Sequence, residues 1–118
     1  SLAYLPDHEP GLGQPLATSN PRWISGRTLA RNASALLHDG QYTDAEYPAR
    51  RGWGHSALSD TLTFAQRNEA QRLLLFHHDP DHDDALLEGL EAEAIQRWSG
   101  LDGQGAVAMA REGETIEL

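Results

Sequence analysis

The chain has 118 residues, of which 39% are hydrophobic, and its 9 basic and 18 acidic side chains give a formal charge of −9. This length allows one domain with one core, and the acidic balance argues against a broad surface that tracks nucleic-acid phosphates. No apolar run approaches the roughly 20 residues of a membrane span and no basic leader precedes one, so we expect a soluble cytoplasmic protein without a membrane partner.

The first third of the chain predicts a strand, a loop and a short helix. Residues 2–5 are apolar and end at the charged tip of residues 7–10, which predicts a buried strand. Residues 11–21 are rich in Gly, Pro, Ser and Asn and are predicted to be a loop. The segment 23–33 favours a helix with Ser25 as N-cap. Its inward-facing residues are expected to be Ile24, Leu29 and Ala30.

The middle third repeats the pattern of an apolar strand followed by an acid. Residues 35–38 form a short apolar run that ends at Asp39 and a turn glycine. Residues 51–56 are predicted to be a loop around His55, and its two glycines would let the backbone approach another group closely. Residues 59–71 favour a helix.

The last third predicts the most apolar strand and the longest helix. Residues 73–76 lead directly to His77, and residues 79–84 open an amphipathic helix whose first acids suit the positive end of the helix dipole. A break is expected at residues 100–105, before closing strands at residues 106–110 and 115–118. The predicted apolar face of the helix comprises Leu86, Leu87, Leu90, Ala94, Ile95 and Trp98. Alternating strands and helices predict an α/β fold.

Polar side chains follow three of the predicted strands, at Asp7, Asp39 and His77. Ligands gather at the carboxyl ends of strands in open α/β sheets. Because the chain has no cysteine, a metal would rely on carboxylate and imidazole, which zinc, manganese and iron accept. Convergence of the three tips would therefore make a metal site. The alternative is that each acid is only a turn residue or a helix cap.

Two further segments have both a functional and a structural interpretation. Residues 77–84 have the composition of a metal-binding tract, but Asp81, Asp83 and Asp84 are expected to cap the following helix and His82 to be solvated. His55 is either a loop histidine packed by its neighbours or a proton donor, a role that suits its ordinary pKa near neutrality. A nucleophilic Ser56 activated by the adjacent His55 is excluded on geometry.

With these segments in order, the chain resembles the C-terminal half of the metallo-β-lactamase-fold hydrolases, on the branch of the tRNA 3′-end endonucleases and related phosphodiesterases. The matching stretches are residues 3–9, 36–43, 52–56 and 73–80. The resemblance implies that residues 1–118 are one partial domain. That domain would supply one sheet, with its helices, of an αββα sandwich.

The resemblance also implies roles for four residues. Asp7 matches the carboxylate that bridges two divalent metal ions, with zinc expected and manganese or iron as alternatives, and His77 matches a histidine ligand of one ion. His55 matches the histidine that protonates the leaving oxygen, and Asp39 stands where the family has a Glu that orients it. A different alignment makes Asp39 the bridging acid. Substrate-binding residues are not identified.

The chain departs from the family in lacking its main metal motif, His-x-His-x-Asp-His, and one further histidine. We therefore expect a fragment that does not hold both ions or hydrolyse a substrate alone. A face lined by Leu36, Leu74 and Phe76 is expected to be exposed, or covered by the missing N-terminal half or by a second chain, as in a homo-oligomer. The function expected when complete is metal-dependent hydrolysis of phosphodiesters or other esters. The alternatives are a non-catalytic dimerisation or regulatory module and an α/β binding domain without a metal.

Overall fold

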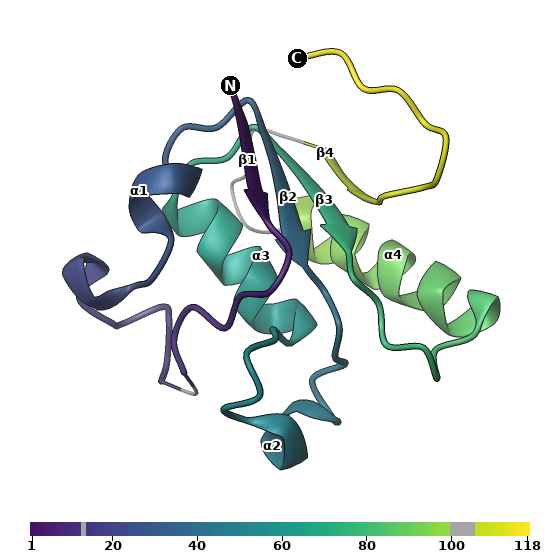
Figure 1. Cartoon of the computed structure of the whole chain (residues 1–118), viewed down its shortest axis with the longest axis horizontal. Helices are drawn as coiled ribbons and strands as arrows, with labels where there is room; N and C mark the ends of the chain where they lie inside the picture. Colours follow the sequence, from purple (N-terminus) through teal and green to yellow (C-terminus); the bar gives the residue numbers. More distant parts are fainter. Residues whose placement is uncertain (13, 100–105) are drawn as a thin grey trace.

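A computed structural model describes residues 1–12, 14–99 and 106–118 as an α/β layer structure (Figure 1). One parallel sheet has the strand order β1-β2-β3-β4. The strands are β1 (Leu2–Leu5), β2 (Ala35–Asp39), β3 (Arg72–Phe76) and β4 (Ala106–Met109). The helices are η1 (Pro21–Trp23), α1 (Arg27–Ala30), α2 (Tyr47–Arg50), α3 (Leu58–Arg67) and α4 (Asp84–Ser99). The prediction of an α/β fold with one sheet and flanking helices is confirmed.

The hydrophobic core lies between the sheet and the helices α3 and α4, which cover the same face (Figure 1). The strand register sets Ala3, Leu36, Leu73 and Val107 in one row across this face, and all four are buried. Leu62, Phe64 and Ala65 of α3 and Leu90, Ala94 and Trp98 of α4 complete the core. The helices on this face explain why the residues in this row are apolar.

The opposite face of the sheet carries a different row, formed by Tyr4, Leu37, Leu74 and Ala108. Tyr4 is 58% exposed and stacks on Phe76, with ring centroids 5.3 Å apart. The expectation that Leu36 belongs to this face is wrong, because its side chain points to the helices and is fully buried. Its neighbour Leu37 takes the place on this face, which we call the open face, and is half-buried. Leu74, also expected to be exposed there, is 9% exposed, so this expectation is wrong as well, and Phe76 is half-buried.

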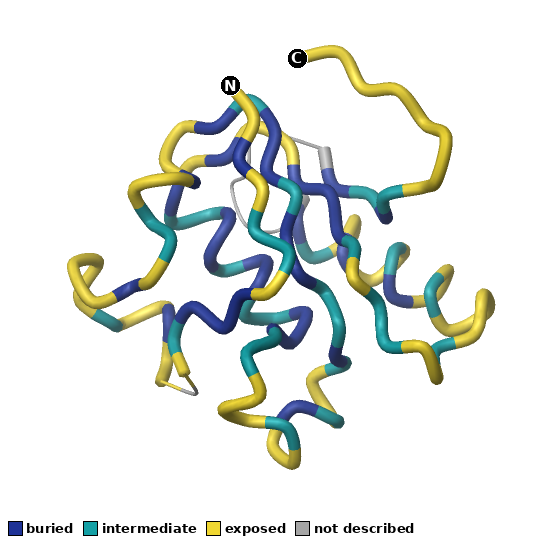
Figure 2. The backbone as a smooth tube through the Cα atoms, in the orientation of Figure 1, coloured by how far each residue is buried: buried dark blue, intermediate teal, exposed yellow. Residues whose placement is uncertain are grey.

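The C-terminal residues lie beside part of this open face. Residues 111–118 are exposed and form no strand, so the predicted strand at residues 115–118 is wrong (Figure 2). Arg72 donates to the backbone oxygen of Glu117 at 2.7 Å. Ile116 borders a hollow of about 380 Å³ over Leu74. The tail therefore contacts the sheet through a few side chains and adds no strand to it.

Two predicted helices differ from the structure in detail. Helix α1 has one turn, and Gly26, at φ 77°, takes the N-cap position predicted for Ser25. Leu29, expected to face inward, is 67% exposed. On α4 the predicted apolar face was too wide, because Leu86 and Ile95 are exposed. The helix buries only the narrow stripe four residues apart at Leu90, Ala94 and Trp98. The break predicted at residues 100–105 lies outside the described residues.

The loops that follow β1, β2 and β3 leave from the same edge of the sheet, because these strands run in the same direction (Figure 1). The prediction that acids cap α4 is confirmed for Asp83, whose carboxylate accepts the backbone N–H of Leu86 at 2.8 Å. No helix in the described part of the chain combines the length and apolar composition that a bilayer span requires.

Candidate active site

Four side chains converge at the carboxyl edge of the sheet, Asp7, Asp39, His55 and His77. One ligand atom from each lies within 4.8 Å of the others. Asp7 follows β1, Asp39 is the last residue of β2, and His77 directly follows β3. His55 comes from the loop between α2 and α3. The structure thus brings together all four residues that the sequence singled out.

The Asp39 carboxylate is the fixed centre of this cluster. It is fully buried, and its Oδ2 accepts hydrogen bonds from the ring Nδ1 of His55 at 2.6 Å and from the backbone N–H of His8 at 3.1 Å. Its Oδ1 accepts the backbone N–H groups of Gln41 at 3.0 Å and Ser56 at 3.4 Å. Four donors compensate the cost of burying the charge, so Asp39 is an organising group with little freedom to move.

Asp7 and His77 are the accessible members of the cluster. Their side chains are 68% and 41% exposed, and Asp7 Oδ1 lies 3.6 Å from His77 Nε2. His77 has a positive φ of 59°, a conformation that non-glycine residues rarely adopt and that is common at functional sites. This backbone turn immediately after β3 places the His77 ring beside Asp7. The ring of the next residue, His78, is not part of the cluster.

The distance between Asp7 and His77 fits a shared metal ion. Two ligands about 2.1 Å from one tetrahedral ion lie about 3.4 Å apart, close to the observed separation. One carboxylate and one imidazole are also a donor pair that zinc, manganese and iron accept. Asp39 and His55 are already bonded to each other, so among the described residues this cluster offers two free side chains as ligands, fewer than a tetrahedral ion needs.

The loop that carries His55 is held by a buried carboxylate that the sequence analysis did not single out. Glu9 is 6% exposed, and it accepts the Tyr47 hydroxyl at 2.6 Å and the backbone N–H groups of Gly52 and Gly54. Burial alone would raise the pKa of Glu9, but these hydrogen bonds and the nearby His55 outweigh it and hold the pKa below its ordinary value.

The two glycines of this loop are needed for their backbone angles. The prediction that they let the backbone approach another group closely is wrong. Their φ values are 88° and 91°, whereas a Cβ added to either would meet no atom within 4 Å. The requirement is therefore conformational and not spatial, since only glycine adopts positive φ without a steric cost.

A pair of buried histidines supports the cluster from inside. The Nδ1 atom of His8 lies 2.7 Å from the Nε2 atom of His38. The other ring nitrogen of His8 contacts the backbone oxygen of Ser25, and the other ring nitrogen of His38 contacts that of Asp39. Burial lowers the pKa of both rings, that of His38 to about 3. The Ser56 hydroxyl donates to the backbone oxygen of His8, which agrees with the exclusion of Ser56 as a nucleophile activated by His55. These contacts hold His8, which follows Asp7, and His38, which precedes Asp39.

Comparison with known proteins gives a relative at low identity. No protein-family model matches the chain. A ribonuclease Z from Salinibacter ruber is 30% identical to it over 86 residues, which are 73% of this chain and 27% of the relative. The chain is distantly similar to ribonuclease Z. It therefore spans about a quarter of the length of the relative that it matches. The similarity supports the resemblance to metallo-β-lactamase-fold hydrolases only at this distant level.

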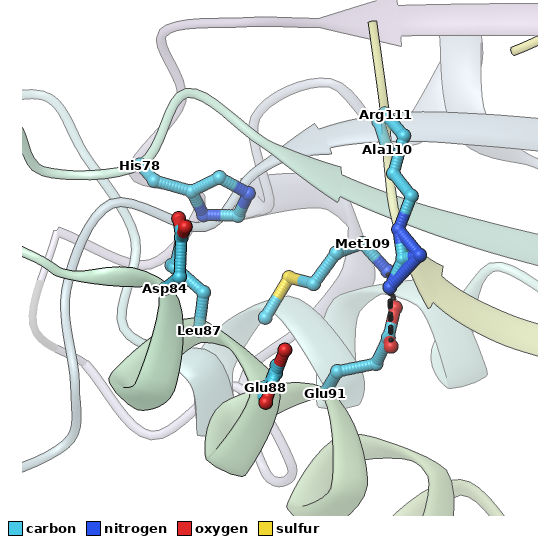
Figure 3. A pocket seen from close by; sticks show the side chains of 8 residues that line it. All are labelled: His78, Asp84, Leu87, Glu88, Glu91, Met109, Ala110 and Arg111. Carbon is cyan, nitrogen blue, oxygen red and sulfur yellow. Dashed lines mark hydrogen bonds and ion pairs between the residues drawn. The ribbon is translucent and has the colours of Figure 1, made fainter.

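The remaining histidines lie outside the cluster. His82 was expected to be solvated, but its side chain is 2% exposed and its Nε2 bonds Glu46 at 2.8 Å, so this expectation is wrong. The bond ties the loop after β3 to the loop after β2. His78 lines a separate hollow of about 260 Å³ between the end of β4 and α4 (Figure 3). An ion pair of Glu91 and Arg111, 2.9 Å long, closes one side of that hollow.

Proposed function

We propose that this chain carries part of the active site of a metal-dependent hydrolase that acts on phosphodiester bonds. The observation that carries the proposal is the convergence of Asp7, Asp39, His55 and His77 at one edge of the sheet. The similarity to ribonuclease Z supports the reaction class and a phosphodiester as substrate. The non-catalytic module is not favoured, because a scaffold alone would not require this set of acids and imidazoles.

Asp7 and His77 are the proposed metal ligands. A divalent ion held there would polarise the phosphoryl group and activate a water near neutral pH. Zinc is the ion we expect, with manganese or iron as alternatives, and a second ion bridged by Asp7 belongs to the same proposal. The ligands that this chain lacks would come from another segment of the same protein or from a second chain. That partner would also cover the open face of the sheet at Tyr4 and Leu37.

His55 is the proposed general acid, and Asp39 is its positioning residue. The Nδ1–H of His55 donates to Asp39, which leaves Nε2 as the ring atom that can give a proton. In hydrolysis the oxygen of water bonds to phosphorus and the bond to the leaving oxygen breaks. The proton from His55 would then neutralise that oxygen, and the Asp39 carboxylate would stabilise the charged imidazole beforehand.

The test compares two substrates on the protein completed by its missing ligands. Nitrophenolate leaves without a proton, whereas the alkoxide of a dinucleotide needs one. His55→Ala should therefore slow dinucleotide hydrolysis by about 10²–10⁴-fold and affect bis(p-nitrophenyl) phosphate far less. Metal content should not change, and His78→Ala is the matched control. Equal losses on both substrates, or no loss, would exclude His55 as the general acid.

A further inference from the structure

The loop that holds His55 also holds a tryptophan in solvent. Trp53 is 62% exposed and stands between Gly52 and Gly54. Both glycines donate their backbone N–H to the buried Glu9 carboxylate at 2.9–3.0 Å. The chain is therefore fixed on either side of the indole. Because a buried charge holds the loop in this form, the exposure of Trp53 is a built feature of the fold.

An arginine lies against this indole and continues toward the cluster. The guanidinium carbon of Arg50 is 4.8 Å from the centre of the Trp53 ring and 5.9 Å from that of Tyr42. The ring of Tyr42 is in turn edge-on to His55, with centroids 5.9 Å apart. Within the described part of the chain, Arg50 forms no ion pair. The Arg50 guanidinium thus contacts both the exposed Trp53 ring and the Tyr42 ring, and Tyr42 contacts the proposed proton donor His55.

The charge of Arg50 has a further consequence in this chain. The formal charge is −9, and the cluster contributes the carboxylates of Asp7 and Asp39. A phosphate monoester or diester would be repelled by this field, except beside a metal ion and beside a cation such as Arg50. Guanidinium also stacks on planar rings, so Arg50 can meet both the phosphate and a ring attached to it.

We propose that Trp53 and Arg50 form a binding subsite for the planar base of a nucleoside phosphate. This inference rests on the proposed function, in which His55 protonates the leaving oxygen. The leaving group then lies next to His55, and the stack of Tyr42, Arg50 and Trp53 begins at that residue. Indole rings bind bases of any sequence by stacking, and stacked arginine adds a cation–π contribution. A free nucleotide and the end of a strand both present this chemistry.

The test measures binding to this chain by calorimetry with two probes, adenosine 5′-monophosphate and ribose 5-phosphate. Both carry the phosphate, and only the first carries a base. We expect the nucleotide to bind about tenfold more tightly, as a stacked base would. Trp53→Leu should abolish this preference. Trp23→Leu, which removes the other exposed tryptophan, should retain it.

Each outcome bears on the subsite directly. Equal affinity for the two probes, no detectable binding of the nucleotide, or loss of the preference only in Trp23→Leu would overturn it. A short oligoadenylate distinguishes the two possible ligands. If it binds more tightly than the mononucleotide, the ligand is a strand end; if the two bind equally, it is a free nucleotide. The binding assay needs no hydrolysis. If the chain prefers the nucleotide but the completed protein cleaves no substrate, the proposed reaction is refuted and the subsite is not.

Discussion

Replacing the carboxylate that holds the His55 loop should loosen this loop more than any other part of the chain. The perturbation is Glu9→Gln, which keeps the size of the side chain but removes its charge and one acceptor oxygen. The amide nitrogen would then face donors, either the Tyr47 hydroxyl or the N–H of Gly52 or Gly54. Hydrogen bonds to a charged group contribute about 1.5–3 kcal/mol each, so the loss of two predicts a destabilisation of about 3–6 kcal/mol.

This magnitude is large against the total stability of about 5–15 kcal/mol expected for a single domain, but it need not unfold the chain. Urea unfolding measures the free-energy change, and hydrogen exchange of the Gly52 and Gly54 amides measures the local effect. Tyr47→Phe, which removes one bond to this carboxylate, should cost about 1.5–3 kcal/mol. Glu112→Gln, in the exposed tail, is the matched control. Unchanged stability and unchanged exchange in Glu9→Gln would refute the assignment of Glu9 as the loop anchor.

Three further predictions concern protonation and backbone strain. Since burial lowers the pKa of His38 from 6.5 to about 3, unfolding takes up a proton below pH 6.5; stability should fall by about 2 kcal/mol from pH 7 to pH 5, and His38→Gln should flatten this slope in urea titrations. Burial raises the pKa of Asp60, so its ionisation opposes folding at neutral pH; Asp60→Asn should raise the melting temperature at pH 7 and lose this advantage in acid. Gly54→Ala should cost about 1–2 kcal/mol because of its positive φ, whereas Gly89→Ala inside α4 should gain about 0.5–1 kcal/mol; the opposite order would contradict the conformational argument.

The strands could be predicted from the sequence, but their orientation could not. Residues 36–37 and 73–75 are leucine throughout, and an uninterrupted apolar run has no alternation that shows which side chain faces the helices. The strand register decides it, by pairing Leu36 with Leu73 on the core face. This is why Leu36 was assigned to the wrong face while the strand itself was correctly located.

The site residues at strand ends were accessible to sequence reasoning, since parallel strands place their carboxyl ends at one edge. Their supporting contacts were not. Glu9 bonds the backbone more than 40 positions along the chain, and His38 bonds His8 across 30 positions. Such pairs leave no periodic signal. The only sequence hint of the Glu9 contact was the pair of glycines around Trp53, which indicated a constrained backbone without naming its partner.

A zinc titration of the chain, followed by NMR of the six histidine rings, shows whether Asp7 and His77 together hold a metal ion beside His55. We expect the ring nitrogens of His77 to shift first and those of His78 and His82 to stay unchanged. Asp7→Ala should weaken the His77 response, and Asp81→Ala should leave it unchanged. A response centred on His78 or His82, or a His77 response that Asp7→Ala does not alter, would contradict the claim.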